Sequence, residues 1–256
     1  MLYPSKNLCY PVLDPNLSRG QVGYWPLDDQ GGIAYDRSGY GNHGPLVGNT
    51  HSVVSERGRC LSFDGAGDYV DAGNNPSINI TNNQITVSIW VYAAATSSYL
   101  IIVDKGEAWT KGYYLYRRDN DNWITWRVET TGGDNYVQTS RAIPNVWQHI
   151  VGTYNGSIVR IYVDGITVGG AEAVAASGNI NATTNNLWIG QSRVAGINAF
   201  NGLISDATIH NRALSAQEIQ QLYLYGIHIH RDLIELWTTS GTIIPRIQYY
   251  NQQARA

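Results

Sequence analysis

Hydrophobic and polar residues alternate along the middle of the chain with the period of a β-strand. In residues 85–92 the odd positions are Ile, Val, Ile and Val, and the even positions are polar or aromatic. Such alternation indicates a strand with one face in a dry core. Similar runs occupy residues 99–103, 113–117, 123–129, 147–154, 158–163 and 187–190. Clusters of Gly, Asn, Asp and Pro separate them and no βαβ alternation is visible, so the pattern predicts an all-β sandwich or barrel.

Two dipeptides between these runs predict tight hairpin turns. Asn155-Gly156 and Asp164-Gly165 both join an alternating run to the next one. A two-residue type I′ turn needs positive φ at both central positions, and Asn-Gly and Asp-Gly are its preferred pairs. We therefore expect a type I′ turn at each site.

One short helix is predicted near the end of the alternating region. Ser215 and Glu218 have the spacing of a capping box, in which each side chain bonds the other residue's backbone N–H. The apolar positions that follow predict a helix over about 216–224, ending before Gly226, a suitable residue for a helix C-terminus.

The residues after this helix have the pattern of an added segment. Residues 227–230 and 243–250 alternate like strands. On a strand, His228 and His230 would lie on one face and could chelate zinc, but no third ligand is nearby in sequence. We therefore interpret the two histidines as polar residues on an exposed strand face.

Composition narrows the choice of function. Charged residues make up 14% of the chain and the net charge is −3, with 18 Tyr and 8 Trp against 2 Phe. Only three lysines are present, so nucleic-acid binding through phosphates is not expected. There is no apolar run of membrane-spanning length, and the first residues lack a secretory leader, which favours folding in a cytoplasm. The two cysteines, Cys9 and Cys60, could form a disulfide or remain thiols.

Several motifs resemble those of one known family, in the order in which that family carries them. The most specific is Asp-x-Ser-Gly-x-Gly-Asn-His-Gly at residues 36–44. The other matching segments are residues 23–28, 61–65, 68–70, 86–91, 147–151, 162–165, 200–206 and 211–215. Together they resemble the laminin-G-like, concanavalin A-like lectin-glucanase jelly roll, which implies two antiparallel sheets packed face to face.

The resemblance also suggests how the chain is organised. We expect an N-terminal extension at 1–22, which would act as a docking arm, a jelly-roll domain at 23–226 with one short C-terminal helix, and a C-terminal extension at 227–256. Residues 14–20 and the aromatic, basic tail resemble the stand-alone form of this domain in tailed-phage virion proteins.

The chain lacks the residue patterns of the enzymes that share this fold. Related glycoside hydrolases carry Glu-x-Asp-x-x-Glu, which supplies two carboxylates about 5 Å apart, and none of the six glutamates here has that spacing. No Gly-x-Ser-x-Gly elbow is present. Residues 39–44 match Gly-x-Gly-x-x-Gly, but Pro45 and the residues after it do not predict the helix that a dinucleotide site needs. We therefore expect no catalysis.

A structural calcium ion is one expectation that follows from the resemblance. In this fold such an ion often ties an early loop to the last strand of the domain. The side chains in the matching segments are Asp36 and Asp206, with backbone carbonyls and water completing the oxygen ligands. Their alternative role is to cap turns and accept backbone N–H bonds.

Carbohydrate binding is the usual function that the resemblance implies. Aromatic rings stack on sugar rings, and amide or charged groups bond the hydroxyls. One stretch supplies both kinds of group, and its candidate residues are Trp109, Tyr114, Tyr116, Asn120, Asn122, Trp123 and Arg127. Some rings in this stretch alternate into the core, as expected for Trp126, and outward rings could equally bind a neighbouring subunit.

Two functions fit these observations. The first is a non-catalytic virion surface protein, a capsid decoration or tail-associated protein, made in the host cytoplasm and anchored through its termini. It would contact other virion proteins and copies of itself as a homo-oligomer, and its sandwich would bind cell-surface glycans. The alternative is a free carbohydrate-binding lectin of cellular origin.

Overall fold

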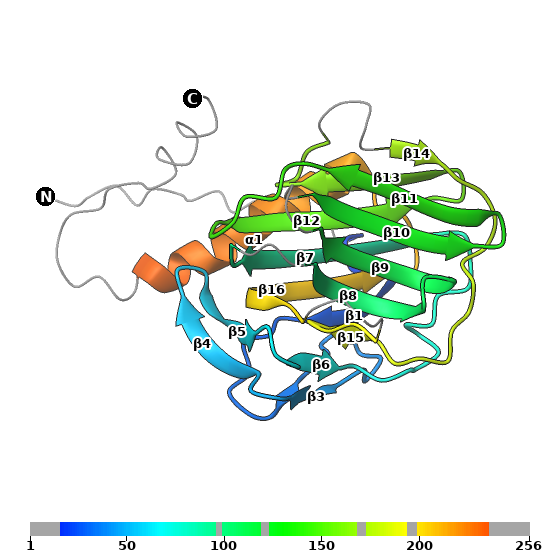
Figure 1. Cartoon of the computed structure of the whole chain (residues 1–256). Coiled ribbons are helices and arrows are strands. Elements are labelled where there is room, and N and C mark those ends of the chain that lie inside the picture. Colours follow the sequence, from blue (N-terminus) through cyan, green and yellow to red (C-terminus); the bar gives the residue numbers. More distant parts are fainter. Residues whose placement is uncertain (1–15, 96–98, 119–122, 168–172, 194–198, 236–256) are drawn as a thin grey trace, which may run out of the picture.

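The computed structural model describes residues 16–95, 99–118, 123–167, 173–193 and 199–235, with only the backbone described for 228–235. Two antiparallel sheets make up the fold (Figure 1). The first contains, in spatial order, β14 (Ala173–Ala175), β13 (Ile158–Val163), β12 (Trp147–Tyr154), β7 (Ile85–Ala93), β16 (Asn201–His210), β5 (Gly58–Asp64) and β4 (His51–Ser55), with β1 (Gln21–Trp25) also paired to β16. The second contains β11 (Gly133–Thr139), β10 (Ile124–Thr130), β9 (Lys111–Arg117), β8 (Leu100–Glu107), β15 (Trp188–Ile189), β6 (Tyr69–Asp71), β3 (Gly44–Val47) and β2 (Ile33–Ala34).

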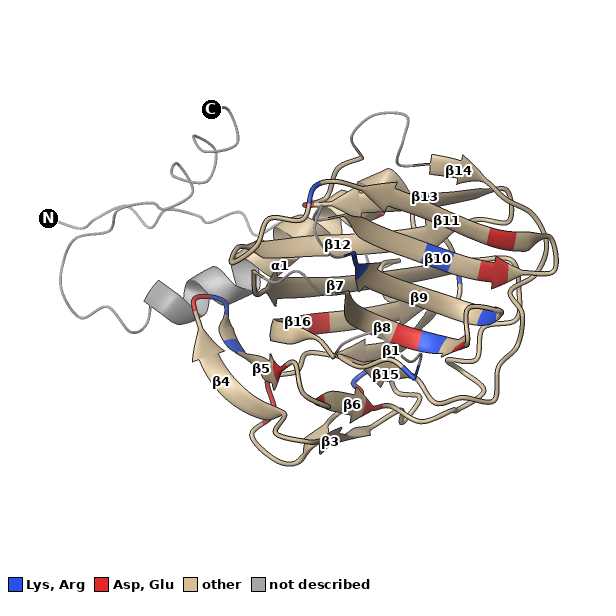
Figure 2. Cartoon of the chain, viewed as in Figure 1, with Lys and Arg blue, Asp and Glu red and all other residues tan. Residues whose placement is uncertain are grey.

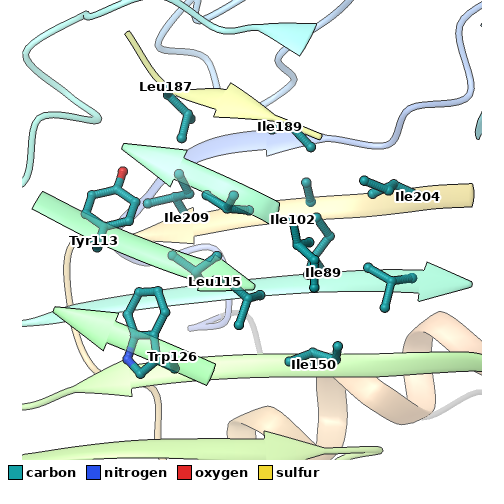
Figure 3. Packing of buried hydrophobic residues seen from close by; sticks show 14 of the residues in the cluster. Ile89, Ile102, Tyr113, Leu115, Trp126, Ile150, Leu187, Ile189, Ile204 and Ile209 are labelled. Atoms are coloured by element: carbon teal, nitrogen blue, oxygen red, sulfur yellow. The ribbon is translucent and has the colours of Figure 1, made fainter. Parts of the chain in front are cut away.

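The core lies between the two sheets, as the alternation predicts. Ile89 and Ile150 of the first sheet and Leu115 and Trp126 of the second point into it (Figure 3). The indole Nε1 of Trp126 donates to the carbonyl of Thr153 at 3.2 Å, so its one polar atom is satisfied inside the core. The two-sheet antiparallel sandwich with one helix is therefore confirmed, and Trp126 is a core residue.

The two predicted type I′ turns have different outcomes. Asp164 and Gly165 both have positive φ, 54° and 77°, so this turn is confirmed. At the other site Gly156 has a φ of 89° and Asn155 does not lie in the positive region. The N–H of Asn155 donates to the carbonyl of Ile158 at 3.3 Å, which makes Gly156 the first central residue. The prediction of a type I′ turn centred on Asn155-Gly156 is therefore wrong.

The helix begins as predicted but continues much further. Helix α1 (Ala216–Glu235) starts with the capping box, because the Ser215 N–H donates to Glu218 Oε2 at 2.8 Å and the Glu218 N–H to Ser215 Oγ at 3.3 Å. It lies across the outer side of the first sheet (orange in Figure 1). The predicted end before Gly226 and the predicted strand at 227–230 are wrong, since both positions belong to this helix.

A contact with the sheet explains why Gly226 lies inside the helix. A Cβ at Gly226 would lie 2.5 Å from Nε1 of Trp90, so only glycine lets the helix approach the indole this closely. The guanidinium of Arg57 lies 3.5 Å from the centre of the Trp90 ring, and its Nη2 donates to the Gly226 carbonyl at 3.3 Å. His228 and His230 are helical positions two residues apart, which do not share a face, so the strand geometry behind the zinc alternative is absent.

Two further expectations from the sequence concern cysteines and membranes. Cys60 is a free, buried thiol, and Cys9 lies outside the described residues, as does the strand-like pattern at 243–250. Within the part of the chain that the structure describes, no helix has both the length and the hydropathy needed to cross a bilayer.

Candidate functional site

A row of aromatic and charged side chains crosses the outer face of the second sheet. Antiparallel pairing places Tyr136 of β11 opposite Arg127, Arg127 opposite Tyr114, Tyr114 opposite Asp104, and Asp104 opposite Trp188. Directly opposed residues share one face, and the intervening residues of these strands, such as Leu115 and Trp126, point into the core. We call these five residues the outer row; together they cross five of the sheet's strands.

The turn between β8 and β9 places a tryptophan over this row. The Thr110 N–H donates to the Glu107 carbonyl at 2.9 Å, which closes a turn with Ala108 and Trp109 at its centre. Both central residues have positive φ, 47° and 62°, as in a type I′ turn. An L-residue with a side chain pays roughly 1–2 kcal/mol for this conformation, so the turn is strained.

Contacts with the outer row hold the strained turn in place. The backbone N–H of Trp109 donates to Tyr114 Oη at 3.0 Å, and Arg127 Nη2 donates to the backbone carbonyl of Trp109 at 3.2 Å. The Trp109 ring lies 4.5 Å from the Tyr114 ring and 5.2 Å from the Tyr116 ring, between centroids. Gly106 makes room for this packing, because a Cβ there would overlap the Tyr114 phenol. Trp109 is half-buried, above two buried tyrosines.

The charge on Arg127 is neutralised by two carboxylates. Its Nε lies 2.6 Å from Glu129 Oε1, and its Nη2 lies 3.0 Å from Asp134 Oδ2. Figure 2 shows charged positions on β10 and β11, and others on β8 and β9 of the same sheet. Burial raises the pKa of Glu129, and Asp134 raises it further, whereas Arg127 lowers it. Burying a carboxylate without a partner costs free energy, so the ion pair between Arg127 and Glu129 stabilises this part of the sheet.

A second aromatic cluster lies further along the same face. The Trp188 ring lies 4.4 Å from the Tyr69 ring, and the Arg193 guanidinium lies 3.4 Å from the centre of the indole. Next to it the carboxylate of Asp104 accepts from the Gly106 N–H at 2.9 Å and from Ser192 Oγ at 3.1 Å. Burial raises the pKa of Asp104. The Arg193 guanidinium lies closer to the centre of the Trp188 ring, at 3.4 Å, than the Arg127 guanidinium lies to that of Trp109, at 5.1 Å, so the Trp188 face is the more closely covered of the two.

The structure brings together four of the predicted sugar-binding residues, namely Trp109, Tyr114, Tyr116 and Arg127. Tyr114 and Tyr116 are buried beneath Trp109, so they support that ring and are not themselves exposed. The half-buried Trp123 lies just before β10, where its carbonyl accepts from the Arg118 N–H at 2.7 Å. Asn120 and Asn122 lie outside the described residues.

Sequence reasoning missed the other members of this face, which are Tyr69, Asp104, Glu129, Asp134, Tyr136, Trp188 and Arg193. Asp104 and Trp188 are 84 positions apart in the sequence, and only strand register makes them neighbours. A local signal exists for Glu129, because Arg127 and Glu129 are two residues apart on one strand and so share a face.

The carboxylate of Asp36 is fully occupied by hydrogen bonds. Its Oδ1 accepts from the N–H groups of Tyr24 and Ser38, and its Oδ2 from Ser38 Oγ and the Asn42 N–H, all within 2.9 Å. Burial raises the pKa of Asp36, but the hydrogen bonds from Ser38, Tyr24 and Asn42 outweigh it and lower the pKa overall. Asp36 thus has the turn-capping role that was the alternative to calcium binding.

Asp206 also has another partner. Its Oδ2 lies 3.2 Å from Arg57 Nη2 and accepts from Ser205 Oγ at 3.2 Å. Calcium needs carboxylate oxygens that are free to coordinate it, so Asp36 and Asp206 as arranged here do not fit a shared calcium site. Among the residues described, no three His, Cys, Asp or Glu side chains cluster as metal ligands.

Comparison with known families agrees with this architecture. A family model described as the concanavalin A-like lectin/glucanases superfamily matches residues 64–220, which is more than half of the chain. The chain therefore belongs to this laminin-G-like, concanavalin A-like family, and its sandwich is a lectin-like fold. A search of curated proteins found no match.

Several solved structures share the fold at low identity. The binding domain of paraclostridial mosquitocidal protein 1 is 16% identical, with a TM-score of 0.67 over 81% of this chain and 52% of that one. The botulinum neurotoxin serotype D ligand-binding domain in complex with N-acetylneuraminic acid is 15% identical, with a TM-score of 0.61 over 80% and 51%. The botulinum neurotoxin DC binding domain in complex with rat synaptotagmin II is 15% identical, with a TM-score of 0.61 over 80% and 52%. The chain spans about half the length of these structures.

Proposed function

We propose that this chain is a non-catalytic glycan-binding module on the surface of a virion, and that Trp109 is its main contact with sugar. The observation that carries the sugar site is the strained turn that holds Trp109 half-buried above Tyr114 and Tyr116. Strained residues cluster at binding sites, and an indole face is suited to stacking on a sugar ring. The similar toxin domain in complex with N-acetylneuraminic acid supports a saccharide as the ligand, without deciding between neutral and acidic sugars for this chain.

The virion role is supported by different features. Residues 14–20 resemble the stand-alone phage form of this domain, and only 14% of the chain is charged, which suits packing against neighbouring proteins. In this proposal the chain is made in the host cytoplasm and contacts other virion proteins and copies of itself through its terminal segments. Mass spectrometry of gradient-purified particles should find the chain at a fixed copy number. Its absence from such particles would contradict the virion role and favour the alternative of a free lectin.

A glycan array tests the sugar site. Trp109→Ala should abolish binding, because it removes the ring that we expect to stack on the sugar. Tyr40→Ala is the matched control, since Tyr40 is an exposed aromatic residue, 51% accessible, that lies in a loop before β3. Binding that survives Trp109→Ala unchanged would place the sugar site elsewhere, and no binding by the unchanged protein would refute the glycan function.

A further inference from the structure

We infer that the Trp109 face selects neutral saccharides and rejects acidic ones, because Glu129 and Asp134 occupy the guanidinium of Arg127, which lies beside the ring. This inference rests on the proposed glycan function and specifies its ligand class. Lectins that bind an acidic sugar need a cation or a set of N–H donors for its carboxylate. The question is therefore whether this face has a cation to offer.

Arg127 lies between two aromatic rings, and two of its three guanidinium nitrogens already have partners in acidic side chains or the backbone. Its guanidinium carbon lies 5.1 Å from the centre of the Trp109 ring and 6.0 Å from that of Tyr136. Its Nε bonds Glu129, and its Nη2 bonds both Asp134 and the carbonyl of Trp109. An acidic sugar that bonded Nε or Nη2 would have to compete with a carboxylate already in place. Glu129 is buried, so displacing it would leave a buried charge unpaired.

The remaining charges on this face also disfavour an anion. Among the described residues, strand register places four carboxylates on the outer face, those of Asp71, Asp104, Glu129 and Asp134, and one guanidinium, that of Arg127. At the Trp109 turn, Lys111 is paired with Glu107 at 2.8 Å. Arg193 is stacked on Trp188 and lies 3.9 Å from Asp104. An incoming carboxylate or sulfate would therefore meet excess negative charge.

Neutral sugars face no such penalty. Asp134 keeps 41% of its side chain accessible, and Tyr136 is 47% exposed, so β11 offers a carboxylate and a phenol beside Arg127. Carboxylate and phenol oxygens can accept hydrogen bonds from sugar hydroxyls. A half-buried indole with acceptors at its side matches the needs of a neutral pyranose.

Matched pairs of probes test the ligand class. N-acetyllactosamine and its sialylated form, and dextran and dextran sulfate, would be compared with the unchanged protein on one array. We expect signal for neutral members only, and binding that does not change between 50 and 500 mM NaCl, because no net charge is exchanged. Acidic members that bind as well as or better than neutral ones would overturn this inference while leaving the proposed function intact. Binding to no glycan would refute both.

Freeing Arg127 gives the complementary experiment. Glu129→Gln with Asp134→Asn removes both carboxylate partners and should raise binding of the acidic members about tenfold, with a new dependence on salt. Asp134→Asn alone is the second variant, since its partly exposed side chain should tolerate the change, and it should give a smaller gain. Thermal unfolding verifies that each variant is folded. If a folded variant shows no gain for acidic probes, Arg127 does not set the specificity.

Discussion

Two buried, uncharged histidines should make the fold sensitive to mild acid. His149 is 1% exposed, with its Nε2 2.7 Å from Ser88 Oγ, and burial, reinforced by the Arg57 charge, lowers its pKa to about 3. His210 is fully buried, its Nε2 donates to the Leu17 carbonyl at 3.0 Å, and burial lowers its pKa to about 4. Lowering the pH from 7 to 5 should therefore lower the free energy of unfolding.

The direction follows from the two protonation equilibria. In the unfolded chain a histidine has a pKa of about 6.5, so between this value and the lower folded pKa only the unfolded chain takes up the proton. The contribution of the uncharged histidines to the free energy of unfolding is therefore fully present above pH 6.5. It declines as the pH falls, by about 1.4 kcal/mol per pH unit and per histidine. From pH 7 to 5 each histidine should cost about 2 kcal/mol, and the two together about 4 kcal/mol.

Buried carboxylates act in the opposite direction, because burial raises the pKa of Asp104, Glu129 and Asp164. Burial raises the pKa of Asp164 to about 6, so the folded chain binds this proton more readily than the unfolded chain, and stability rises as the pH falls below 6. At pH 5 Asp164 offsets about 1.4 kcal/mol, which leaves a loss of at most about 2.6 kcal/mol, and Asp104 and Glu129 reduce it further. Hydrogen bonds from Arg212 and Ser215 overcome the effect of burial and lower the pKa of Glu218 to about 2, so this group loses its stabilising effect only below pH 4.5.

Urea unfolding followed by tryptophan fluorescence at pH 7, 6 and 5 measures this loss. His149→Gln and His210→Gln should each reduce the change between pH 7 and 5 by about 2 kcal/mol, whatever their effect on absolute stability. The slope against pH is therefore the informative quantity. If the change in the free energy of unfolding between pH 7 and 5 were the same in both variants as in the unchanged protein, the two histidines would not be the groups that take up protons on unfolding, contrary to this prediction.

Three other substitutions test separate parts of the structure. Gly226→Ala should destabilise the protein by about 1–2 kcal/mol in urea unfolding although alanine is the better helix former, because its Cβ would meet Trp90; a gain in stability would contradict the helix position. Asp36→Ala should lower the free energy of unfolding by about 3 kcal/mol, since four hydrogen bonds lose their acceptor. Adding EGTA to the unchanged protein should leave its Tm constant. A fall of several degrees with EGTA would favour a bound calcium ion. Ala108→Gly should stabilise the protein by about 0.5–1 kcal/mol and keep glycan binding, and a loss of stability would show that the turn is unstrained.

The sequence predicts those features that depend on neighbouring residues. Alternation locates β7, β12 and β13 within one or two residues, and the capping box of Ser215 and Glu218 forms as expected. The sequence also carries Trp109 and Arg127 in one stretch, and the antiparallel pairing of β9 and β10 brings that stretch back on itself. Trp188 could not be included, since its place beside Asp104 depends on the pairing of β15 with β8, which no local pattern reveals.

The exposure of each ring was equally beyond local reasoning. Tyr114 points away from the core, as the alternation of β9 implies, yet it is fully buried because the preceding turn folds Trp109 over it. The end of the helix fails for a related reason. Glycine at 226 is a good helix terminator, but here its missing side chain admits the indole of Trp90, so a tertiary contact overrides the local preference.

Two hairpin turns in the same chain show what the strain at Trp109 implies. Asp164-Gly165 and Ala108-Trp109 both have positive φ at their two central positions. The first uses the residues that this backbone prefers, whereas the second replaces them with residues that it disfavours by roughly 1–2 kcal/mol each. A hairpin that served only to connect β8 and β9 would gain stability from Asn-Gly. The presence of Trp109 instead is therefore better explained by a role for its ring on the outer face than by the needs of the fold.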